Sequence, residues 1–347
     1  MDKQLIKGNE AVVYGALLGG ATHFFGYPIT PASEIAHSAS LLFTKAGRTF
    51  LQAEDEVNAI NMVYGASAAG ARVMTATSGP GLSLMAEGIS YIAACELPCV
   101  IVDVQRAGPG LGNIWPEQSD YNAVVKGGGH GNYKNIVLAP NSAQEMCEFT
   151  YQAFEIADRF RMPVIILSDA FIGQMMEPVA LPQEVKNGER KEWALYGDGE
   201  SRKNLITSIL MNIDVLSDHN WHLQKKYEKI EEEFYDVEEI ETEDAEILFV
   251  AYGISSRVCI TALQDLRKRG IKIGLLRLKT LFPFPSKRLR ELSSQLKKTI
   301  VVELSNKQLT QDVLLAMENR TPVLTYNWLG GKVPSTEEVL DRIEADL

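Results

Sequence analysis

The stretch AEDEVNAINMVYGASAAGARVMTATSGPGLSLM, residues 53–85, decides the fold class. Its first half repeats apolar side chains at helical spacing over residues 57–71, with many Ala and Gly that allow close packing. Residues 73–77 then form a run without any charge, which predicts a strand buried on both faces. The run ends at the turn residues 78–81, and residues 82–94 return to helical spacing. A buried strand between two helices predicts a parallel sheet of the α/β type.

The same alternation continues along most of the chain and predicts an α/β protein with two parallel-sheet domains. We expect a first domain over residues 1–180, a linker with an acidic helical arm over 181–245, and a second domain over 246–347. The acidic run 228–246 marks the linker, and we expect its side chains to be solvated. The remaining predicted strands are 24–27, 50–53, 99–104, 136–139, 164–167, 247–251, 273–278 and 299–303, and the remaining predicted helices are 142–160, 216–235, 257–269, 287–296 and 308–317.

Composition and charge exclude several classes of protein. Hydrophobic residues make up 46% of the chain and charged residues 23%, which is ordinary for a globular protein. The formal net charge of −11 argues against nucleic acid and anionic membranes as partners. No apolar run is long enough to cross a bilayer, and the first nine residues lack the apolar core of a signal peptide. We therefore expect a cytoplasmic protein.

The cysteine pattern bears on metal sites. The chain has four cysteines, and none of them forms a CxxC pair. Scattered cysteines in a cytoplasmic protein are typical of reduced, buried thiols. We therefore expect no metal site and no iron–sulfur cluster on this chain. The cysteines are Cys95, Cys99, Cys147 and Cys259.

Four polar or glycine-rich segments begin where predicted strands end. Ligands of open α/β sheets bind outside the carboxyl ends of the strands, so these segments predict a binding site. Thr30 offers a hydroxyl, Arg106 a forked cation, and the glycines allow a ligand to approach the backbone closely. The acidic residues offer a proton donor or acceptor. The segments are residues 27–34, 52–56, 77–81 and 105–113.

These segments resemble the alpha subunit of the 2-oxoacid:ferredoxin oxidoreductases. The likeness rests on YPITPASE (27–34), on the stretch 53–85, and on later motifs that extend it over nearly the whole chain. Within the family, the loops most resemble the branch that acts on 2-oxoisovalerate (3-methyl-2-oxobutanoate). The later motifs are ELPCVIVDVQRAGPGLGN (96–113), KGGGHGNY (126–133), VAYG (250–253), LFPFP (281–285) and VVELSNKQL (301–309).

The resemblance implies a thiamine diphosphate site shared between two chains. This chain would supply the pyrimidine-binding domain, followed by a domain like the transketolase C-terminal one. The cofactor needs a carboxylate against its aminopyrimidine ring, and in related enzymes this glutamate lies nine residues before a glycine. Counting back from Gly65 gives Glu56, with Glu54 as the reserve candidate. Ser78 and Gly79 are the other expected cofactor contacts. A first-turn carboxylate that only complements the helix dipole is the alternative role for Glu56.

Thr30 and Arg106 match the family residues that hold the substrate carboxylate. A 2-oxo acid presents a planar carboxylate beside its reacting carbon. A guanidinium can bind such a carboxylate with two parallel hydrogen bonds. The alternative for Thr30 is a helix cap near Pro31, and the alternative for Arg106 is a surface ion pair.

The implied reaction is oxidative decarboxylation of a 2-oxo acid with coenzyme A, giving an acyl-CoA, carbon dioxide and reduced ferredoxin. The resemblance places the diphosphate-binding domain and Mg²⁺ on a beta subunit, and [4Fe-4S] clusters on partner subunits. Ferredoxin-like and gamma subunits would complete the complex, and ferredoxin would accept the electrons. Alternatives are a pyruvate- or 2-oxoglutarate-specific alpha subunit, or a non-catalytic assembly subunit of the same complex. A second basic residue in the substrate pocket would favour 2-oxoglutarate.

Two motifs resemble other sites without their context. Gly197-Asp198-Gly199 with Asn220 downstream imitates the metal motif of thiamine enzymes, but no buried strand precedes it. The glycines at 108, 110 and 112 lack the spacing of a dinucleotide fingerprint, and Gly26-Tyr27-Pro28 is not such a fingerprint either. A Rossmann dehydrogenase is therefore disfavoured. We expect the glycines of 108–112 to belong to a loop that closes over the substrate.

Overall fold

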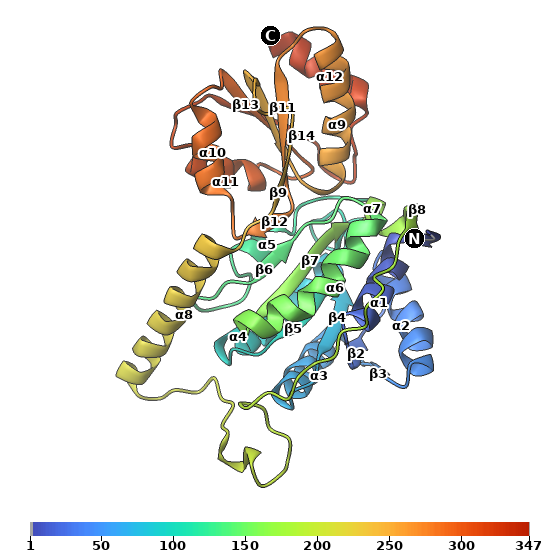
Figure 1. Cartoon of the computed structure of the whole chain (residues 1–347), viewed down its shortest axis with the longest axis vertical. Coiled ribbons are helices and arrows are strands. Elements are labelled where there is room, and N and C mark those ends of the chain that lie inside the picture. Colours follow the sequence, from blue (N-terminus) through green and yellow to red (C-terminus); the bar gives the residue numbers. More distant parts are fainter. Residues whose placement is uncertain (1–2, 347) are drawn as a thin grey trace.

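The computed structural model describes residues 3–346, which form two α/β units (Figure 1). The ends of the predicted domains at 1–2 and 347 lie outside the described residues. The first unit is built on a seven-stranded sheet and the second on a five-stranded sheet. Most strand pairs in both sheets are parallel, so the predicted fold class is confirmed. Within residues 3–346, no helix has the length and hydropathy needed to cross a membrane.

The seven-stranded sheet has the order β12-β6-β7-β5-β4-β2-β3. Its central strands carry almost only buried side chains, because helices cover both faces. Only β12 runs antiparallel to its neighbour, and it comes from the far end of the chain. The strands are β2 (His23–Gly26), β3 (Thr49–Gln52), β4 (Val73–Thr77), β5 (Cys99–Gln105), β6 (Ile136–Leu138), β7 (Pro163–Asp169) and β12 (Thr280–Phe282).

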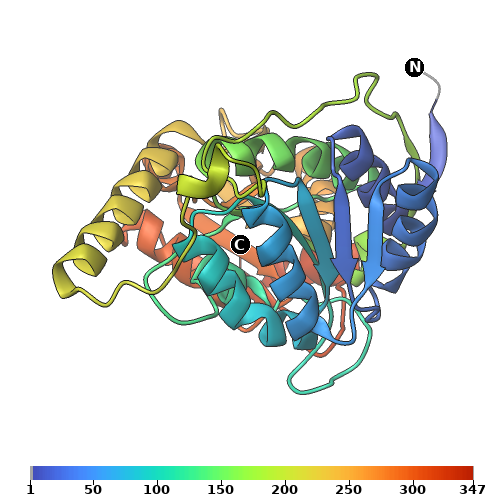
Figure 2. The same cartoon turned by 90° about the horizontal axis from the view of Figure 1, so that it is seen from below.

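Helices α3 and α4 cover one face of this sheet, and α1 and α6 cover the other (Figure 2). A small antiparallel pair, β1 (Gln4–Lys7) with β8 (Met176–Val179), closes the edge of the unit. Helix α1 and this strand pair were not predicted from the sequence, and α2 was expected only as a helix beginning near Pro31. The helices are α1 (Gly8–Leu18), α2 (Ser33–Lys45), α3 (Glu56–Ala68), α4 (Gly79–Ala94), α5 (Tyr121–Val125), α6 (Ala143–Phe160) and α7 (Ala170–Gln174).

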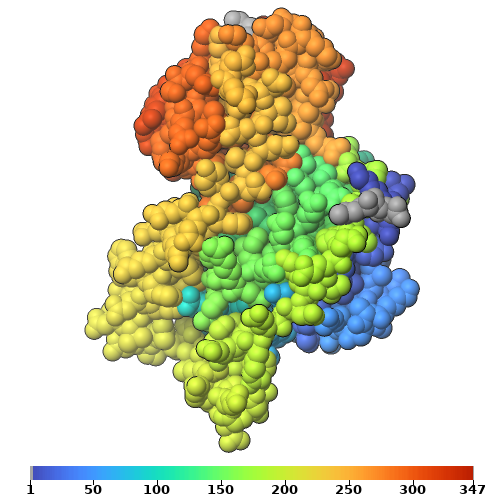
Figure 3. Space-filling model, in the orientation of Figure 1, coloured from blue at the N-terminus to red at the C-terminus, as the bar shows by residue number. Residues whose placement is uncertain are grey.

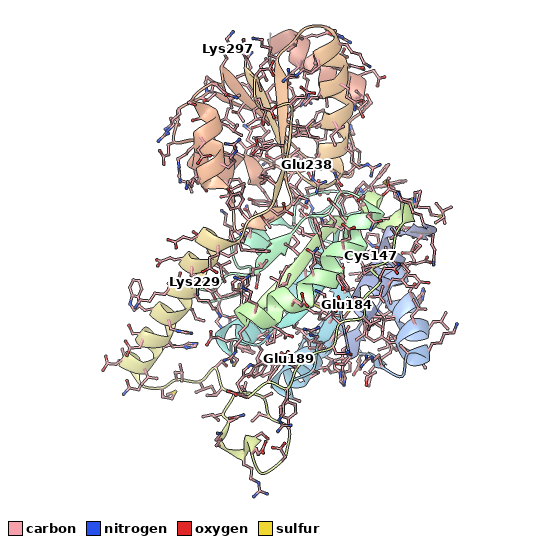
Figure 4. All side chains as sticks on the ribbon, viewed as in Figure 1. Cys147, Glu184, Glu189, Lys229, Glu238 and Lys297 are labelled. Carbon is pink, nitrogen blue, oxygen red and sulfur yellow. The ribbon has the colours of Figure 1, made fainter. Side chains whose placement is uncertain are left out.

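Glycines set the distance between α1 and α6. A Cβ added at Gly15 would overlap the backbone carbonyl oxygen of Cys147, a residue of α6 labelled in Figure 4. A Cβ at Gly19, one turn later, would lie 2.7 Å from the carbonyl oxygen of Tyr151. The two glycines share one helix face, so α1 presents bare backbone to α6. This close approach explains why glycines are tolerated there despite their low helix propensity.

The segment between the units contains the predicted helical arm. A 3-10 turn, η1 (Ser201–Lys203), precedes the long helix α8 (Ile213–Glu233). Figure 3 shows this helix and the loop before it projecting from the first unit. The expected linker bounds 181–245 differ from the structure at their end, because β9 (Val237–Ile240) already belongs to the second sheet.

Two glutamates of the acidic run form contacts with arginines of the second unit. Glu238, labelled in Figure 4, forms an ion pair of 3.1 Å with Arg277, whose side chain is only 3% exposed. Glu239 accepts a hydrogen bond of 2.6 Å from Arg288. Both glutamates remain exposed, as expected of a solvated run, and their contacts with the two arginines join β9 to the second unit.

The second unit has the strand order β14-β13-β10-β11-β9, in which only β9 is antiparallel to its neighbour. The strands predicted at 247–251 and 273–278 have the same bounds in the structure. The strands are β10 (Ile247–Ala251), β11 (Ile273–Leu278), β13 (Lys298–Glu303) and β14 (Val323–Asn327), and the helices are α9 (Gly253–Lys268), α10 (Ser286–Ser293), α11 (Gln308–Met317) and α12 (Thr336–Asp346).

The two units are joined by more than their linker. Strand β12 leaves the second unit and pairs antiparallel with β6 of the first, with Thr280 opposite Leu138. The buried side chain of Gln118, in the first unit, extends into the second unit. It donates to the carbonyl of Tyr252 (3.0 Å) and accepts from Ser255 Oγ (2.9 Å) and Leu304 N (2.9 Å). Each unit therefore completes the hydrogen bonding of the other.

We predict that Gly15→Ala destabilises the protein by about 1–3 kcal/mol, because the added methyl would force α1 away from α6. Urea denaturation of the purified chain measures the change in the free energy of unfolding. Gly65→Ala on α3 is the matched control, since a Cβ there meets nothing within 4 Å. It should stabilise the helix by about 0.5–1 kcal/mol. Equal effects of the two substitutions would contradict the packing role of Gly15.

Candidate functional site

The carboxyl ends of four adjacent strands form one rim of the first sheet. Strands β5, β4, β2 and β3 are neighbours in that order, and their pairings are parallel. The four segments singled out in the sequence each begin where one of these strands ends. The structure therefore brings them together at the edge where open α/β sheets bind ligands.

Glu56 is the first residue of α3, and its side chain points into the protein. It is 5% exposed, whereas the side chain of Glu54 is exposed. Asp55 fixes this arrangement, because its carboxylate caps the helix by accepting from Asn58 N at 2.7 Å. Because Asp55 caps the helix, its side chain lies on the surface side of the turn, and the side chain of the next residue, Glu56, points into the protein. Of the two candidate glutamates, only Glu56 lies buried at the rim.

Gly81 makes room for the Glu56 carboxylate. A Cβ at position 81 would lie 2.6 Å from Glu56 Oε1 and would overlap Thr77 Oγ1. Only a glycine at this position lets the first turn of α4 lie directly against the carboxylate. The sequence Gly79-Pro80-Gly81 thus shapes a cradle in which a buried carboxylate meets the start of a helix.

Ser78 and Gly79 begin α4 on the same rim. Ser78 is the N-cap residue by backbone geometry, yet its side chain makes no capping hydrogen bond. Its Oγ is buried and has no partner among residues 3–346. Gly79 backs onto Asp120, since a Cβ there would lie 3.2 Å from Asp120 Oδ2. A buried hydroxyl without a partner is free to bond to a ligand at this point.

Arg106 and Thr30 are in direct contact, through the backbone of Thr30. Nη1 of Arg106 donates to the Thr30 carbonyl at 2.8 Å, and Nη2 donates to the Leu111 carbonyl at 3.1 Å. The Nε–H is buried and has no partner within the described part of the chain. The guanidinium therefore ties the Thr30 loop to the glycine-rich loop and keeps further donors for an anion. It forms no ion pair with a residue in the described range 3–346, and Thr30 lies just before α2 with its side chain exposed.

Two aspartates that sequence analysis did not propose lie at this rim. Asp103 is fully buried in β5, and burial raises its pKa well above the ordinary value, with a further increase from the neighbouring Asp120 carboxyl. Burial raises the pKa of Asp120 to about 6, and the negative charge of Glu117 acts in the same direction. The only sequence signal was one acid in an otherwise apolar strand.

Glu117 was also missed, and it fixes the glycine-rich loop. Its carboxylate accepts from Gly108 N at 3.0 Å and from Gly330 N at 2.7 Å. Gly330 belongs to the second unit, which therefore helps to hold the loop that follows Arg106. The predicted role of this loop in closing over a substrate stays a prediction.

Two cavities open on either side of the contact between Arg106 and Thr30. A cavity of about 580 Å³, called here the apolar pocket, has Glu34 as its one charged lining residue within the described chain. A second cavity of about 930 Å³, called here the interdomain pocket, lies between the two units and is lined by Arg106, Glu117, Asp120 and Gln308 among others. The apolar pocket is lined by Thr30, Pro31, Glu34, Ile114, Trp115, Pro116, Ala170, Phe171, Gln174 and Met175.

The Gly197-Asp198-Gly199 motif lies away from the rim. Leu195 N donates to the Ala68 carbonyl just before β4 begins, so this loop contacts the amino ends of the strands. Asp198 accepts from Arg190 at 2.5 Å and from Ser201 N at 2.8 Å. The hydrogen bond from Arg190 is the main cause that lowers the pKa of Asp198 to about 2. The carboxylate thus stabilises a turn on the opposite edge of the sheet.

Comparison with known families covers almost the whole chain. Residues 14–243 match the family model described as pyruvate flavodoxin/ferredoxin oxidoreductase, thiamine diphosphate-binding. Residues 245–339 match the model of pyruvate:ferredoxin oxidoreductase core domain II. Among curated proteins, the ketoisovalerate oxidoreductase subunit VorB of Methanothermobacter thermautotrophicus is 55% identical, over 99% of this chain and 97% of its own. The 2-oxoglutarate synthase subunit KorA of Archaeoglobus fulgidus is 40% identical over the full length of both chains.

Solved structures give the same result. The 2-oxoglutarate:ferredoxin oxidoreductase from Magnetococcus marinus superposes with a TM-score of 0.90 at 28% identity, covering 99% of this chain and 65% of that chain. A split gene transketolase shares the fold at 14% identity, with a TM-score of 0.60 over 99% of this chain and 98% of its own. With both family models matched in order and relatives aligned from end to end, the chain belongs to the family of 2-oxoacid:ferredoxin oxidoreductase subunits.

Proposed function

We propose that this chain is the pyrimidine-side subunit of a thiamine diphosphate-dependent complex that oxidises a branched-chain 2-oxo acid, best matched by 2-oxoisovalerate. The products are the acyl-CoA, carbon dioxide and reduced ferredoxin. The observation that carries the proposal is the buried Glu56 carboxylate in its Gly81 cradle, on the same rim as Arg106. The relatives named ketoisovalerate oxidoreductase subunits support the branched-chain substrate.

The residues at the rim fit an aminopyrimidine. Glu56 offers a carboxylate that can hold a proton against a ring nitrogen, and the cradle at Gly81 keeps water from it. Ser78 offers a buried hydroxyl without a partner, and Gly79 lets a flat ring approach the backbone. When bound, thiamine diphosphate supplies a nucleophilic carbon and an electron sink for the decarboxylation. In this proposal, Mg²⁺ and the diphosphate are held by a beta subunit.

Arg106 and Thr30 would receive the substrate carboxylate. Arg106 has donors to spare beyond those given to the Thr30 and Leu111 carbonyls, and its Nε–H is buried and unpartnered within residues 3–346. A carboxylate is the natural acceptor for such a group, because a charge-assisted hydrogen bond relieves the buried donor. The Thr30 side chain borders the apolar pocket, so the remainder of the substrate would extend into it.

The apolar pocket favours an uncharged substrate side chain. Its lining within residues 3–346 includes Ile114, Trp115, Phe171 and Met175 and contains no Lys, Arg or His. The second carboxylate of 2-oxoglutarate would enter this pocket without a cation to pair with. The same observation weighs against the 2-oxoglutarate alternative, although one relative of that name is 40% identical.

The electron acceptor would lie on partner chains. All four cysteines of this chain are free and buried, as expected of core thiols. We propose that ferredoxin-like and gamma subunits carry the [4Fe-4S] clusters and that coenzyme A is the co-substrate. The intact rim residues argue against a purely structural assembly subunit.

Glu56→Gln should slow exchange of the cofactor C2 proton by about 10²–10⁴-fold in the reconstituted complex. The amide keeps the shape of the side chain but cannot exchange a proton with the ring nitrogen. NMR after acid quench in deuterated solvent measures the exchange. Glu54→Gln is the matched control and should change the rate little, because Glu54 is exposed. Slow exchange in Glu54→Gln with normal exchange in Glu56→Gln would assign the role to Glu54 instead. Normal exchange in both variants would reject the proposed function.

Arg106→Lys should lower kcat/KM for the 2-oxo acid by an amount that corresponds to about 1.5–3 kcal/mol, with little change in cofactor affinity. A lysine keeps the charge but cannot bond the Thr30 carbonyl, the Leu111 carbonyl and a carboxylate in one plane. Steady-state kinetics and calorimetric titration of the cofactor separate the two effects. Unchanged kinetic constants would limit Arg106 to a structural role.

Phe171→Arg should reduce kcat/KM for 2-oxoisovalerate at least about tenfold and shift the preference toward 2-oxoglutarate. The substitution puts a cation on the wall of the apolar pocket, where it repels an apolar side chain and attracts a carboxylate. Competition between the two substrates measures the preference. Leu41→Arg, on the exposed side of α2, is the control for surface charge. An unaltered preference in Phe171→Arg would show that the substrate side chain lies elsewhere.

A further inference from the structure

Asp103 and Asp120 form a pair of carboxyl groups that the proposed reaction leaves unused. Asp103 is 0% exposed, and neither of its oxygens accepts a hydrogen bond from any N–H or hydroxyl donor among residues 3–346. The Asp120 carboxyl is its neighbour: the Asp120 backbone N–H donates to Gln105 Oε1 at 3.2 Å, two residues further along the same strand, and the nearby Asp120 carboxyl raises the pKa of Asp103. Two neighbouring carboxyl groups can hydrogen-bond to each other only when one of them carries a proton.

The surroundings determine where the remaining charge lies. Burial and the Asp120 carboxyl both raise the pKa of Asp103, and no cation among residues 3–346 offsets them. Asp120 faces Arg106 and Glu117 on its own loop, and Tyr252 from the second unit. It also lies behind Gly79, at the positive end of the helix α4. The proton therefore belongs on Asp103, and the charge belongs on Asp120.

We propose that Asp103 and Asp120 share one proton and act as a positioning pair for the rim. The protonated Asp103 donates to Asp120, and the single negative charge of Asp120 holds the first turn of α4 and the Arg106 guanidinium in place. The role in positioning rests on the proposed function, since it concerns Ser78, Gly79 and Arg106. The shared proton does not rest on it.

The position of Asp120 explains why a single charge matters. Its Oδ2 is buried and accepts from no donor in the described part of the chain, and Asp120 lines the interdomain pocket together with Arg106. Its backbone N–H donates to Gln105 Oε1 at 3.2 Å, so the side chain is held against the end of β5. If both carboxyls were ionised, two like charges would lie together inside the protein, and their repulsion would push the loop from the sheet. One proton removes that repulsion.

Infrared spectroscopy tests the shared proton directly. The full chain is labelled with ¹³C-aspartate, and spectra of wild type and variants are compared near pH 7.5. Wild type should show the carbonyl stretch of a protonated aspartic acid, and Asp103→Asn should lose it. Asp341→Asn, at an exposed position on α12, should leave the band unchanged. A wild-type spectrum without this band overturns the proposal, whether or not the complex is active.

Denaturation across pH supplies a second, independent readout. The folded wild type keeps a proton that an unfolded aspartate releases above about pH 4, so its stability falls as pH rises from there toward the raised pKa of Asp103. Asp103→Asn lacks this group. The ratio of variant to wild-type folding constants should therefore rise by up to about tenfold per pH unit above pH 5. A ratio that does not change with pH overturns the shared proton.

Kinetics of the reconstituted complex test the positioning role. Asp103→Leu removes the donor to Asp120 and should reduce kcat/KM for the 2-oxo acid at least about tenfold. Asp103→Asn restores a donor of the same shape and should recover most of the loss. Equal loss in both variants, with the infrared band present in wild type, overturns the positioning role. An inactive wild-type complex that shows the band rejects the proposed function and leaves the shared proton standing.

Discussion

The buried amide of Gln118 is the interaction on which the site depends. Its side chain belongs to the first unit, but the partners that satisfy it lie at the ends of β10 and β13 in the second. Loss of a partner for a buried polar group lowers the stability of the folded state by about 1–3 kcal/mol. The hydrogen bonds of this amide therefore fix the position of the loop that carries it. Arg106, Glu117 and Asp120 all lie on that loop. The rim is therefore shaped by both units, although its strands come from only one.

Local signals in the sequence were enough for much of the fold. The predicted strands 73–77, 247–251 and 273–278 and the helix 308–317 have the bounds that the structure gives, because each is a continuous apolar or periodic run. A local signal also predicted one residue of the candidate site. Glu56 and Gly65 lie on the same helix, so their spacing can be read from the sequence. In the structure Glu56 is buried and Glu54 is exposed. The roles of these residues stay predictions.

Features that depend on distant contacts could not be predicted. Strand β12 has three residues, and its partner β6 lies about 140 positions earlier in the chain. Strand β9 lies within an acidic run, and its glutamates pair with Arg277 and Arg288, which come from distant parts of the sequence. Asp103 was visible as an odd acid in a strand, but its significance depends on Asp120, which approaches it through the fold of a loop.

The exchange of β12 between the units has a consequence for how the chain is made. Synthesis proceeds from the amino terminus, so β2 to β7 leave the ribosome long before residues 280–282 exist. Until then β6 has a bare edge, with backbone donors and acceptors that can pair with any passing strand. The first unit is thus finished only after the second has begun to fold. The unit that is synthesised first is therefore not the unit whose sheet is completed first.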